Sequence, residues 1–278
     1  MQNRVLPQPV RPFLKWPGGK YRLVDRIRSA LGPGRRLIEP FAGSGAVFLN
    51  TNYERFLIAD SNLDLIDLYT RLVDDGDDLI ETSRELFQPE TNLRGHYYTL
   101  REEFNHTRHS RRRAALFLYL NRHCYNGLCR YNGSGGFNSP FGRYRRPYFP
   151  ELEMRGFIAK AQTARFMHAG FEASMALARR GDVVYCDPPY TPLSRTAHFT
   201  DYHTGGFGWE DQERLAQIAQ HLGRRGIQVV ISNHDTVATR VLYSVLGARI
   251  QSFKVRRTIS CNAKQRNRVG ELLAVFDD

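Results

Sequence analysis

Apolar runs and helical patterns alternate near both ends of the chain. Residues 38–48 open with an apolar strand that ends in a glycine-rich turn, and residues 55–60 form a second apolar strand. A third strand, residues 182–186, stops at two prolines. Strands that alternate with helices in this way predict an α/β sheet.

The middle of the chain shows helical spacing without strand alternation. Its apolar positions predict three helices, over residues 63–72, 97–104 and 111–119. A segment rich in Gly, Asn and Ser follows, and it predicts a flexible hairpin loop over residues 131–144. The loop is also basic and aromatic, and a helical insert with such a loop is typical of a module that reads DNA, so we expect residues 61–150 to form a mainly helical recognition domain.

Beyond residue 150 the α/β pattern resumes. The pattern predicts helices over 151–164 and 210–222, a strand over 227–231, and two final antiparallel strands over 250–255 and 272–276. The two flanking parts must meet to form one site. We therefore expect residues 1–60 and 151–278 to form one discontinuous domain, which would carry the catalytic site if the motifs described next have a catalytic role.

The stretch Asp187-Pro188-Pro189-Tyr190 carries the clearest chemistry. Asp187 stands at the carboxyl end of a predicted strand, where open α/β sheets bind ligands. The Asp187 carboxylate and the Pro188 carbonyl could each accept one N–H of an exocyclic amine on a planar base, while Tyr190 stacks on the ring. The alternative is a strand that simply ends in a proline-rich turn.

The glycine turn and the acid after it point to a nucleoside ligand. Gly43 and Gly45 allow the backbone to approach a nucleotide or adenosyl group closely. Phe48 occupies the third glycine position of a dinucleotide fingerprint, which disfavours pyrophosphate. Asp60 ends the next strand, where a carboxylate binds ribose hydroxyls or caps the following helix.

A further segment, Trp16-Pro-Gly-Gly-Lys20, precedes an amphipathic helix. It is not a P-loop, because Tyr21 stands where a hydroxyl that binds Mg²⁺ should be. The two glycines indicate that the backbone approaches a ligand, although Trp16 could equally be a core residue.

In this order these stretches resemble the alpha-group DNA adenine-N6 methyltransferases of the Dam type. The resemblance extends from residue 13 to about residue 277. It includes the insert motifs at 119–132 and 137–144 and the stretch 231–235. It implies a Rossmann-like, S-adenosylmethionine-dependent sheet of seven strands, the last antiparallel, with an inserted DNA-recognition domain.

The resemblance also implies roles for individual residues. Catalysis falls to Asp187, Pro188 and Tyr190. The residues expected to bind S-adenosylmethionine are Trp16, Lys20, Phe41, Gly43, Gly45, Asp60 and Asp187. The residues expected to read a GATC site are Lys15, Leu128, Arg130, Pro140 and Tyr144.

Four further residues are expected to contact the duplex in other ways. Tyr125 would wedge beside a flipped adenine, and Arg101, Asn126 and Asn132 would contact the backbone. Two of them have a plain alternative: Tyr125 as a buried ring, and Arg101 as part of a solvated helix face. The basic segment 256–268 predicts phosphate contacts that do not depend on the DNA sequence, with a loop that faces solvent as the alternative.

Composition agrees with double-stranded DNA as the partner. The net charge is +12, which favours a polyanion, although a solvated basic face is possible. Four cysteines without a C-x-x-C pair indicate a reducing compartment and no metal site. Without an apolar leader or membrane span, we expect a cytoplasmic protein that associates with the nucleoid through DNA, with no obligate protein partner.

Three other functions remain open at this point. The same site chemistry suits an RNA adenine or a DNA cytosine-N4 methyltransferase. A non-catalytic DNA-binding regulator would need a decayed site, whereas the motif residues are intact. A nicotinamide oxidoreductase is opposed by Phe48 and by the early position of Asp60.

Overall fold

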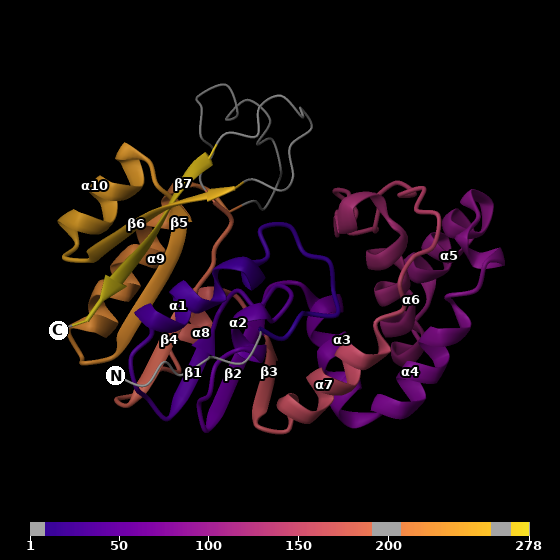
Figure 1. Ribbon diagram of the computed structural model, residues 1–278, viewed down its shortest axis with the longest axis horizontal. Helices are drawn as coiled ribbons and strands as arrows, with labels where there is room; N and C mark the ends of the chain where they lie inside the picture. Colours follow the sequence, from indigo (N-terminus) through magenta and orange to yellow (C-terminus); the bar gives the residue numbers. More distant parts are fainter. Residues whose placement is uncertain (1–8, 191–206, 257–267, 278) are drawn as a thin grey trace. The chain divides into compact units, whose positions relative to one another are not determined.

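The strands of the protein form one mixed sheet. The computed structural model describes residues 9–190, 207–256 and 268–277. Within them seven strands run in the order β3-β2-β1-β4-β5-β7-β6 (Figure 1). The strands are β1 (Arg36–Glu39), β2 (Arg55–Asp60), β3 (Ala164–His168), β4 (Asp182–Cys186), β5 (Gln228–His234), β6 (Arg249–Arg256) and β7 (Arg268–Phe276).

Strand direction matches the expected class. β1 pairs in parallel with β2 and β4, and β4 pairs in parallel with β5. β7 is antiparallel to both of its neighbours, β5 and β6. The predicted α/β sheet of seven strands with the last antiparallel is therefore confirmed.

Burial explains which strands were visible in the sequence. Residues Val183, Val184, Tyr185 and Cys186 of β4 are all buried, as expected of a parallel strand covered on both faces. No residue of β3 is fully buried, so β3 lacks a continuous apolar run, and the sequence analysis missed it.

The chain divides into two compact units. The second unit comprises Ile27–Ala42, Tyr53–Ser61 and Ala169–Asp278. Its helices are α8 (Phe171–Met175), α9 (Trp209–Gly223) and α10 (Val237–Val245). Helix α9 packs on β5 and β7, and α10 packs on β6 and α9. The predicted helix at 210–222 and the strands at 227–231, 250–255 and 272–276 are confirmed within a few residues.

The first unit comprises Met1–Arg26, Gly43–Asn52 and Asn62–His168. Its main helices are α3 (Leu63–Asp74), α4 (Gly76–Glu85), α5 (Arg94–His106), α6 (Ser110–His123) and α7 (Glu151–Ala161). Residues 114–121 of α6 are all buried, because α3, α4 and α5 pack around it. A helix that is apolar on every side is a central one.

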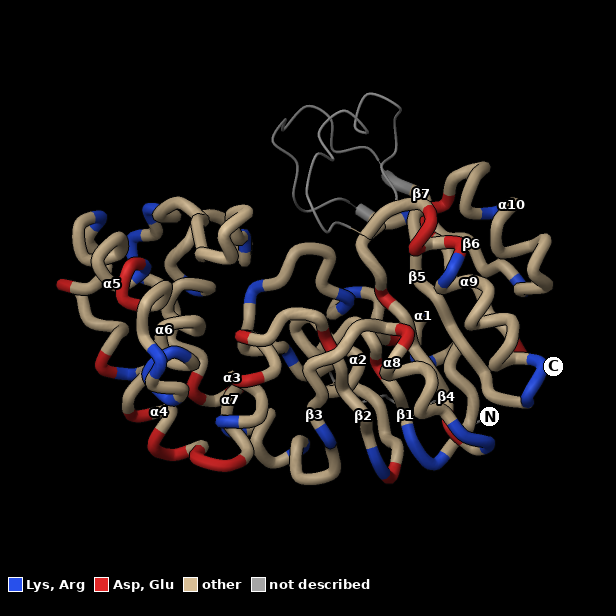
Figure 2. The backbone as a smooth tube through the Cα atoms, turned by 180° about the vertical axis from the view of Figure 1, so that it is seen from behind, with Lys and Arg blue, Asp and Glu red and all other residues tan. Residues whose placement is uncertain are grey.

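Short helices complete the chain. They are η1 (Lys20–Leu23), α1 (Val24–Ala30), α2 (Ala46–Leu49), η2 (Glu90–Asn92) and η3 (Tyr125–Gly127). The sequence analysis missed α4, which buries only Leu79, Ile80 and Ser83 and is otherwise largely acidic. Figure 2 shows the acidic positions of α4 and the basic positions elsewhere along the tube.

The region after α6 folds back on itself. Isolated antiparallel bridges join Cys124 to Phe141 and Tyr131 to Phe137. The Tyr131 hydroxyl donates to Asp64 Oδ2 of α3 at 2.7 Å, and Arg113 of α6 donates to Asp64 Oδ1 at 2.6 Å. The predicted hairpin is thus anchored to two helices of its own unit.

Candidate functional site

Two carboxylates of the second unit, Asp60 and Asp187, lie at the carboxyl ends of β2 and β4, the two strands that flank β1. Glu39 of β1 pairs with Ile58 of β2, and Ile38 pairs with Val184 of β4. This register brings Asp60 and Asp187 to the same edge, one on each side of the β1 strand. Two strand spacings separate such positions by about 10 Å.

The Asp187–Tyr190 turn is held by its neighbours in the second unit. The Tyr190 hydroxyl donates to Glu271 Oε2 at 3.3 Å, and its ring meets the His234 ring edge-on at 4.7 Å. Burial, and then the Asp187 carboxylate, raise the pKa of Tyr190 well above its usual value. The phenol therefore stays neutral and positions its ring beside Asp187.

Aromatic side chains surround Phe41 in the same unit. The Phe41 ring stacks on Phe171, with a centroid distance of 5.7 Å, and meets Phe207 edge-on at 5.5 Å. The Asp60 carbonyl accepts a hydrogen bond from Ala169 at 3.1 Å, which ties the end of β2 to the segment before Phe171. A half-buried aromatic ring on this edge, together with the Asp60 carboxylate, fits the adenine and ribose of an adenosyl group.

The sequence analysis missed Phe171 and Phe207 as companions of Phe41. It also missed Gln212, whose side chain reaches the Pro189 carbonyl at 2.8 Å. Their spacing along the chain carries no signal, because each joins the site only through the packing of separate elements.

In the first unit, Trp16 explains the glycine at position 43. Gly43 has φ 47°, and a Cβ there would lie 2.9 Å from Trp16 Cδ1. The Gly43 carbonyl accepts a hydrogen bond from Tyr69 at 2.6 Å. The close approach expected of this glycine is thus made to the indole of Trp16, which the structure brings against the glycine turn.

The other two cofactor candidates of the first unit are Gly45 and Lys20. Gly45 has φ 71° and caps the start of α2. Lys20 is buried, and its Nζ donates to the Gly18 carbonyl at 2.6 Å. A buried ammonium next to glycines supplies a positive charge suited to an anionic group.

Lys15 and Tyr144 meet in the first unit. The Lys15 ammonium lies 3.7 Å from the centroid of the Tyr144 ring and donates to the Arg122 carbonyl at 3.0 Å. Burial, and then the charge of Arg122, lower the pKa of Lys15 to about 8. The Tyr144 hydroxyl accepts a hydrogen bond from the Asn126 backbone at 3.0 Å.

The turn after α6 exposes two large apolar side chains. Tyr125 is 48% exposed and Leu128 38% exposed. The backbone N–H of Tyr125 donates to the Pro140 carbonyl at 2.9 Å, and Pro140 is itself exposed. Asn126 adopts φ 54°, an uncommon left-handed conformation for a residue other than glycine. The alternative of a buried ring for Tyr125 is therefore wrong.

Arg130 is fixed by a residue of the opposite side of the hairpin. Its Nε donates to Asn138 Oδ1 at 2.7 Å, and its Nη2 donates to the Asn138 carbonyl at 3.1 Å. The guanidinium plane is held, and its outer edge can still donate. Asn132 differs, since its Oδ1 accepts from Ser134 at 3.1 Å and Gly136 at 2.8 Å within the loop.

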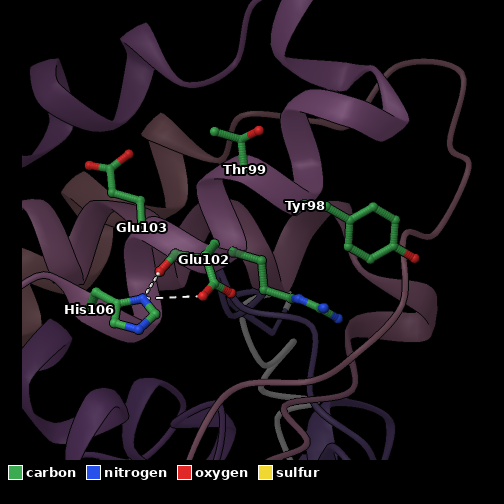
Figure 3. Close-up of a pocket in the computed structure, with 6 residues that line it drawn as sticks. Tyr98, Thr99, Glu102, Glu103 and His106 are labelled. Atoms are coloured by element: carbon green, nitrogen blue, oxygen red, sulfur yellow. Dashed lines mark hydrogen bonds and ion pairs between the residues drawn. The ribbon is translucent and has the colours of Figure 1, made fainter.

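Helix α5 carries a surface pocket (Figure 3), and Arg101 is one of the residues that line it. Its guanidinium carbon lies 4.7 Å from the Tyr98 ring centroid, and Nη1 donates to the Ser139 carbonyl at 3.3 Å. The pocket residues are Tyr98, Thr99, Arg101, Glu102, Glu103 and His106. No predicted catalytic or cofactor residue lines this pocket.

The structure adds basic residues that the sequence analysis did not single out. Arg143, Arg145 and Arg146 lie on both sides of Tyr144, and all three arginines are exposed. The dense run of arginines was the available signal. Residues 257–267 of the predicted basic loop lie outside the described residues, as does Cys261.

The described part of the chain contains no helix with the length and apolar character that crossing a membrane requires. The same residues contain no group of three His, Cys, Asp or Glu side chains arranged to hold a metal ion.

Comparison with known proteins gives the family. A solved structure, the C-terminal domain of precorrin-6Y C5,15-methyltransferase from Rhodobacter capsulatus, aligns over 97% of this chain and 98% of its own, with TM-score 0.44 and 12% identity. Proteins named DNA adenine methylase from Salmonella typhi and Escherichia coli (strain K12) are each 54% identical over 266 residues, covering 96% of this chain and 95% of each relative.

A protein of the same name from Vibrio cholerae (strain O395) is 50% identical over 267 residues, covering 96% of both chains. Residues 16–259 match the family described as D12 class N6 adenine-specific DNA methyltransferase. The resemblance noted from the sequence is confirmed: the chain belongs to the D12 class of N6 adenine-specific DNA methyltransferases.

Proposed function

We propose that this enzyme transfers a methyl group from S-adenosylmethionine to the N6 amine of adenine in GATC sites of duplex DNA. The observation that carries the proposal is Asp187 at the carboxyl end of β4, followed by two prolines and a fixed Tyr190. The family match supports adenine in DNA over RNA or cytosine-N4. The relatives named DNA adenine methylase support the same reaction.

The acceptor nitrogen needs activation. The lone pair of an adenine amine is delocalised into the ring, so the nitrogen is a poor nucleophile. The Asp187 carboxylate and the Pro188 carbonyl accept its two N–H bonds, favour a pyramidal nitrogen and stabilise the positive charge that develops on it. When bound, S-adenosylmethionine supplies an electrophilic methyl group on its sulfonium.

The target adenine must leave the duplex to reach these groups. Tyr190 then offers a ring for stacking, in an orientation fixed by Glu271 and His234. Tyr125 is exposed on a tight turn and fills the space that the flipped base leaves. A large ring on a rigid turn loses little entropy when it enters the base stack.

The cofactor roles follow the two units. In the second unit Asp60 binds the ribose hydroxyls and Phe41 covers the adenine ring. In the first unit, the residues proposed to bind S-adenosylmethionine, on the basis of the resemblance, are Trp16, Lys20, Gly43 and Gly45. The fit of the Phe41 and Asp60 side chains to an adenosyl group supports S-adenosylmethionine as the methyl donor.

Base reading falls to the turn and hairpin of the first unit. Arg130 reads guanine, because a held guanidinium presents two parallel donors to guanine O6 and N7. Lys15 donates to a second guanine from its place over Tyr144. Leu128, Pro140 and Tyr144 contribute contacts to base edges, and Arg101, Asn126 and Asn132 contact phosphates.

The reaction is tested by expressing the chain in a host that lacks adenine methylation. Its DNA is then digested with nucleases that differ in tolerance to methylated GATC. Resistance confined to GATC sites is expected, and uniform sensitivity would refute the assignment. The Asp187→Ala variant should lose methyl transfer by about 10²–10³-fold or more while duplex binding survives; normal turnover would remove Asp187 from catalysis.

Site reading is tested separately with Arg130→Ala. It should lose about 1–3 kcal/mol of discrimination at one guanine position. Arg145→Ala is the matched control, since Arg145 is an exposed arginine of the same region. We expect the control to weaken binding to all duplexes equally. An equally uniform loss in Arg130→Ala would make Arg130 a phosphate contact.

A further inference from the structure

A buried chain of polar side chains lies behind the Asp187–Tyr190 turn. Gln212 of α9 is 1% exposed, and Asn233 of β5 and Tyr243 of α10 are each 0% exposed. Helix α9 packs against both of the other elements in the second unit (Figure 1). Buried polar groups in such a position are retained only when they are hydrogen-bonded.

One end of this series of hydrogen-bonded side chains is the Pro189 carbonyl of the turn. Gln212 Nε2 donates to the Pro189 carbonyl at 2.8 Å. On the other side, Gln212 Oε1 accepts from Asn233 Nδ2 at 2.9 Å and from the Tyr243 hydroxyl at 3.3 Å. Asn233 Nδ2 also donates to the Tyr243 oxygen at 2.9 Å.

The direction of every bond in this chain is determined. The Pro189 carbonyl can only accept, so the amide nitrogen of Gln212 must face it. The Asn233 Oδ1 accepts from the His234 backbone at 2.8 Å, so its Nδ2 must face Gln212 and Tyr243. These bonds orient the Gln212 amide so that it presents one N–H donor to the Pro189 carbonyl.

The bonded carbonyl belongs to the second proline, next to the carbonyl that the reaction uses. The proline rings set φ at both positions, which leaves ψ as the soft dihedral of each residue. Gln212 fixes where the Pro189 carbonyl points, and Glu271 and His234 fix Tyr190 just beyond it. The peptide between Asp187 and Tyr190 is thus restrained on the side away from the substrate.

We propose that Gln212 is a positioning residue for methyl transfer: its N–H bond to Pro189 holds the turn so that the Pro188 carbonyl and the Asp187 carboxylate face the target amine. This rests on the proposed adenine-N6 chemistry. Gln212 itself touches neither DNA nor donor. Its effect is on the geometry of the acceptor pair.

The expected consequence is a split between kcat and KM. Misplacing a stabilising oxygen by a fraction of an ångström weakens the transition state more than the ground state. A Gln212→Met variant keeps the volume of the side chain and removes the donor. Its kcat should fall about 10–100-fold, less than the loss of a direct contact, whereas KM for the donor and Kd for a GATC duplex stay within about twofold.

A second variant, Gln212→Glu, separates positioning from simple stability. An ionised carboxylate at this position would present only acceptors to the Pro189 carbonyl, and burial raises the pKa of such a carboxyl. When protonated it can donate in place of the amide. Relative to the unmodified enzyme, the kcat of this variant should therefore recover as pH falls from about 8 to about 6.

Gln220→Glu is the matched control on the same helix. The Gln220 side chain also donates from Nε2 to a backbone carbonyl, that of Leu246, at 2.9 Å. Its partner Leu246 follows α10 and is not part of the Asp187–Tyr190 turn, so Gln220→Glu should lower the melting temperature and leave kcat and its pH profile unchanged.

The kinetics of these variants distinguish failure of the positioning role from failure of the proposed function. If Gln212→Met has normal kcat, or if Gln212→Glu loses kcat equally at every pH and in step with Gln220→Glu, the positioning role is overturned. If Gln212→Glu does not fold, the kcat and KM of Gln212→Met decide alone. If the unmodified enzyme fails to methylate GATC duplexes in parallel, the proposed function fails instead.

Discussion

Replacement of Gly127 by alanine should disturb both the stability of the first unit and its reading of DNA. Gly127 has φ 69°, and a Cβ built there overlaps the Lys15 Cβ and lies 3.2 Å from the Lys15 Cδ. Lys15 cannot simply retreat. Its backbone N–H donates to Asn121 Oδ1 at 2.9 Å, and its carbonyl accepts from Asn121 Nδ2 at 2.7 Å.

The magnitude follows from three contributions. A residue other than glycine in the left-handed conformation costs roughly 1–2 kcal/mol. Overpacking against a clamped neighbour adds about 1–3 kcal/mol. The lower entropy of the unfolded alanine chain offsets about 0.4–1 kcal/mol. The free energy of unfolding should therefore fall by about 1–5 kcal/mol.

The same overlap displaces the Lys15 ammonium from the Tyr144 ring, so discrimination between GATC and a duplex with one substituted guanine should narrow. Urea denaturation measures the first effect, and fluorescence anisotropy with the two duplexes measures the second. Gly133→Ala is the control, because a Cβ at Gly133 meets nothing within 4 Å and its φ lies outside the left-handed region.

Gly133→Ala should change the free energy of unfolding by less than about 1 kcal/mol and leave discrimination intact. If the two alanine variants show the same free energy of unfolding and the same discrimination between duplexes, close packing against Lys15 is not the reason for a glycine at position 127.

Three further predictions concern the recognition region. Because burial lowers the pKa of Lys15 to about 8, its positive charge is present below that pH and is lost as pH rises through it. Binding to a GATC duplex should therefore weaken between about pH 7 and 9, and Lys15→Arg should flatten this pH dependence. Identical pH profiles for the two proteins would exclude the Lys15 charge as a contact to DNA. Tyr131→Phe removes the hydroxyl bonded to Asp64 and should cost about 1–3 kcal/mol in denaturant titration; an unchanged midpoint would contradict this anchor. A duplex with 2-aminopurine at the target should brighten on binding, and Tyr125→Ala should reduce that signal; equal brightening would dismiss the wedge.

The strands and helices that the sequence predicted share one property. Their apolar residues form either a continuous run or a helical repeat within a single element, as in Val183–Cys186 of β4 and the apolar face of α9. Elements with few buried residues, such as β3 and α4, left no such pattern and became visible only in the structure.

The candidate site divides in the same way. Asp187, Pro188 and Tyr190 could be proposed as catalytic from the sequence because they are contiguous in the chain. The residues that hold them are not: Gln212 lies 23 positions from Pro189, and Glu271 lies 81 positions from Tyr190. Likewise, nothing in the sequence linked Asn138 to Arg130 across the hairpin.

By itself, then, the amino-acid order determined the class of sheet and the family, and it indicated the groups proposed to contact the target base, since each is written in a short stretch of chain. Only the folded chain decided how those groups are aimed. Hydrogen bonds between distant segments depend on which elements pack together, and burial away from water is what makes each such bond directional and costly to lose.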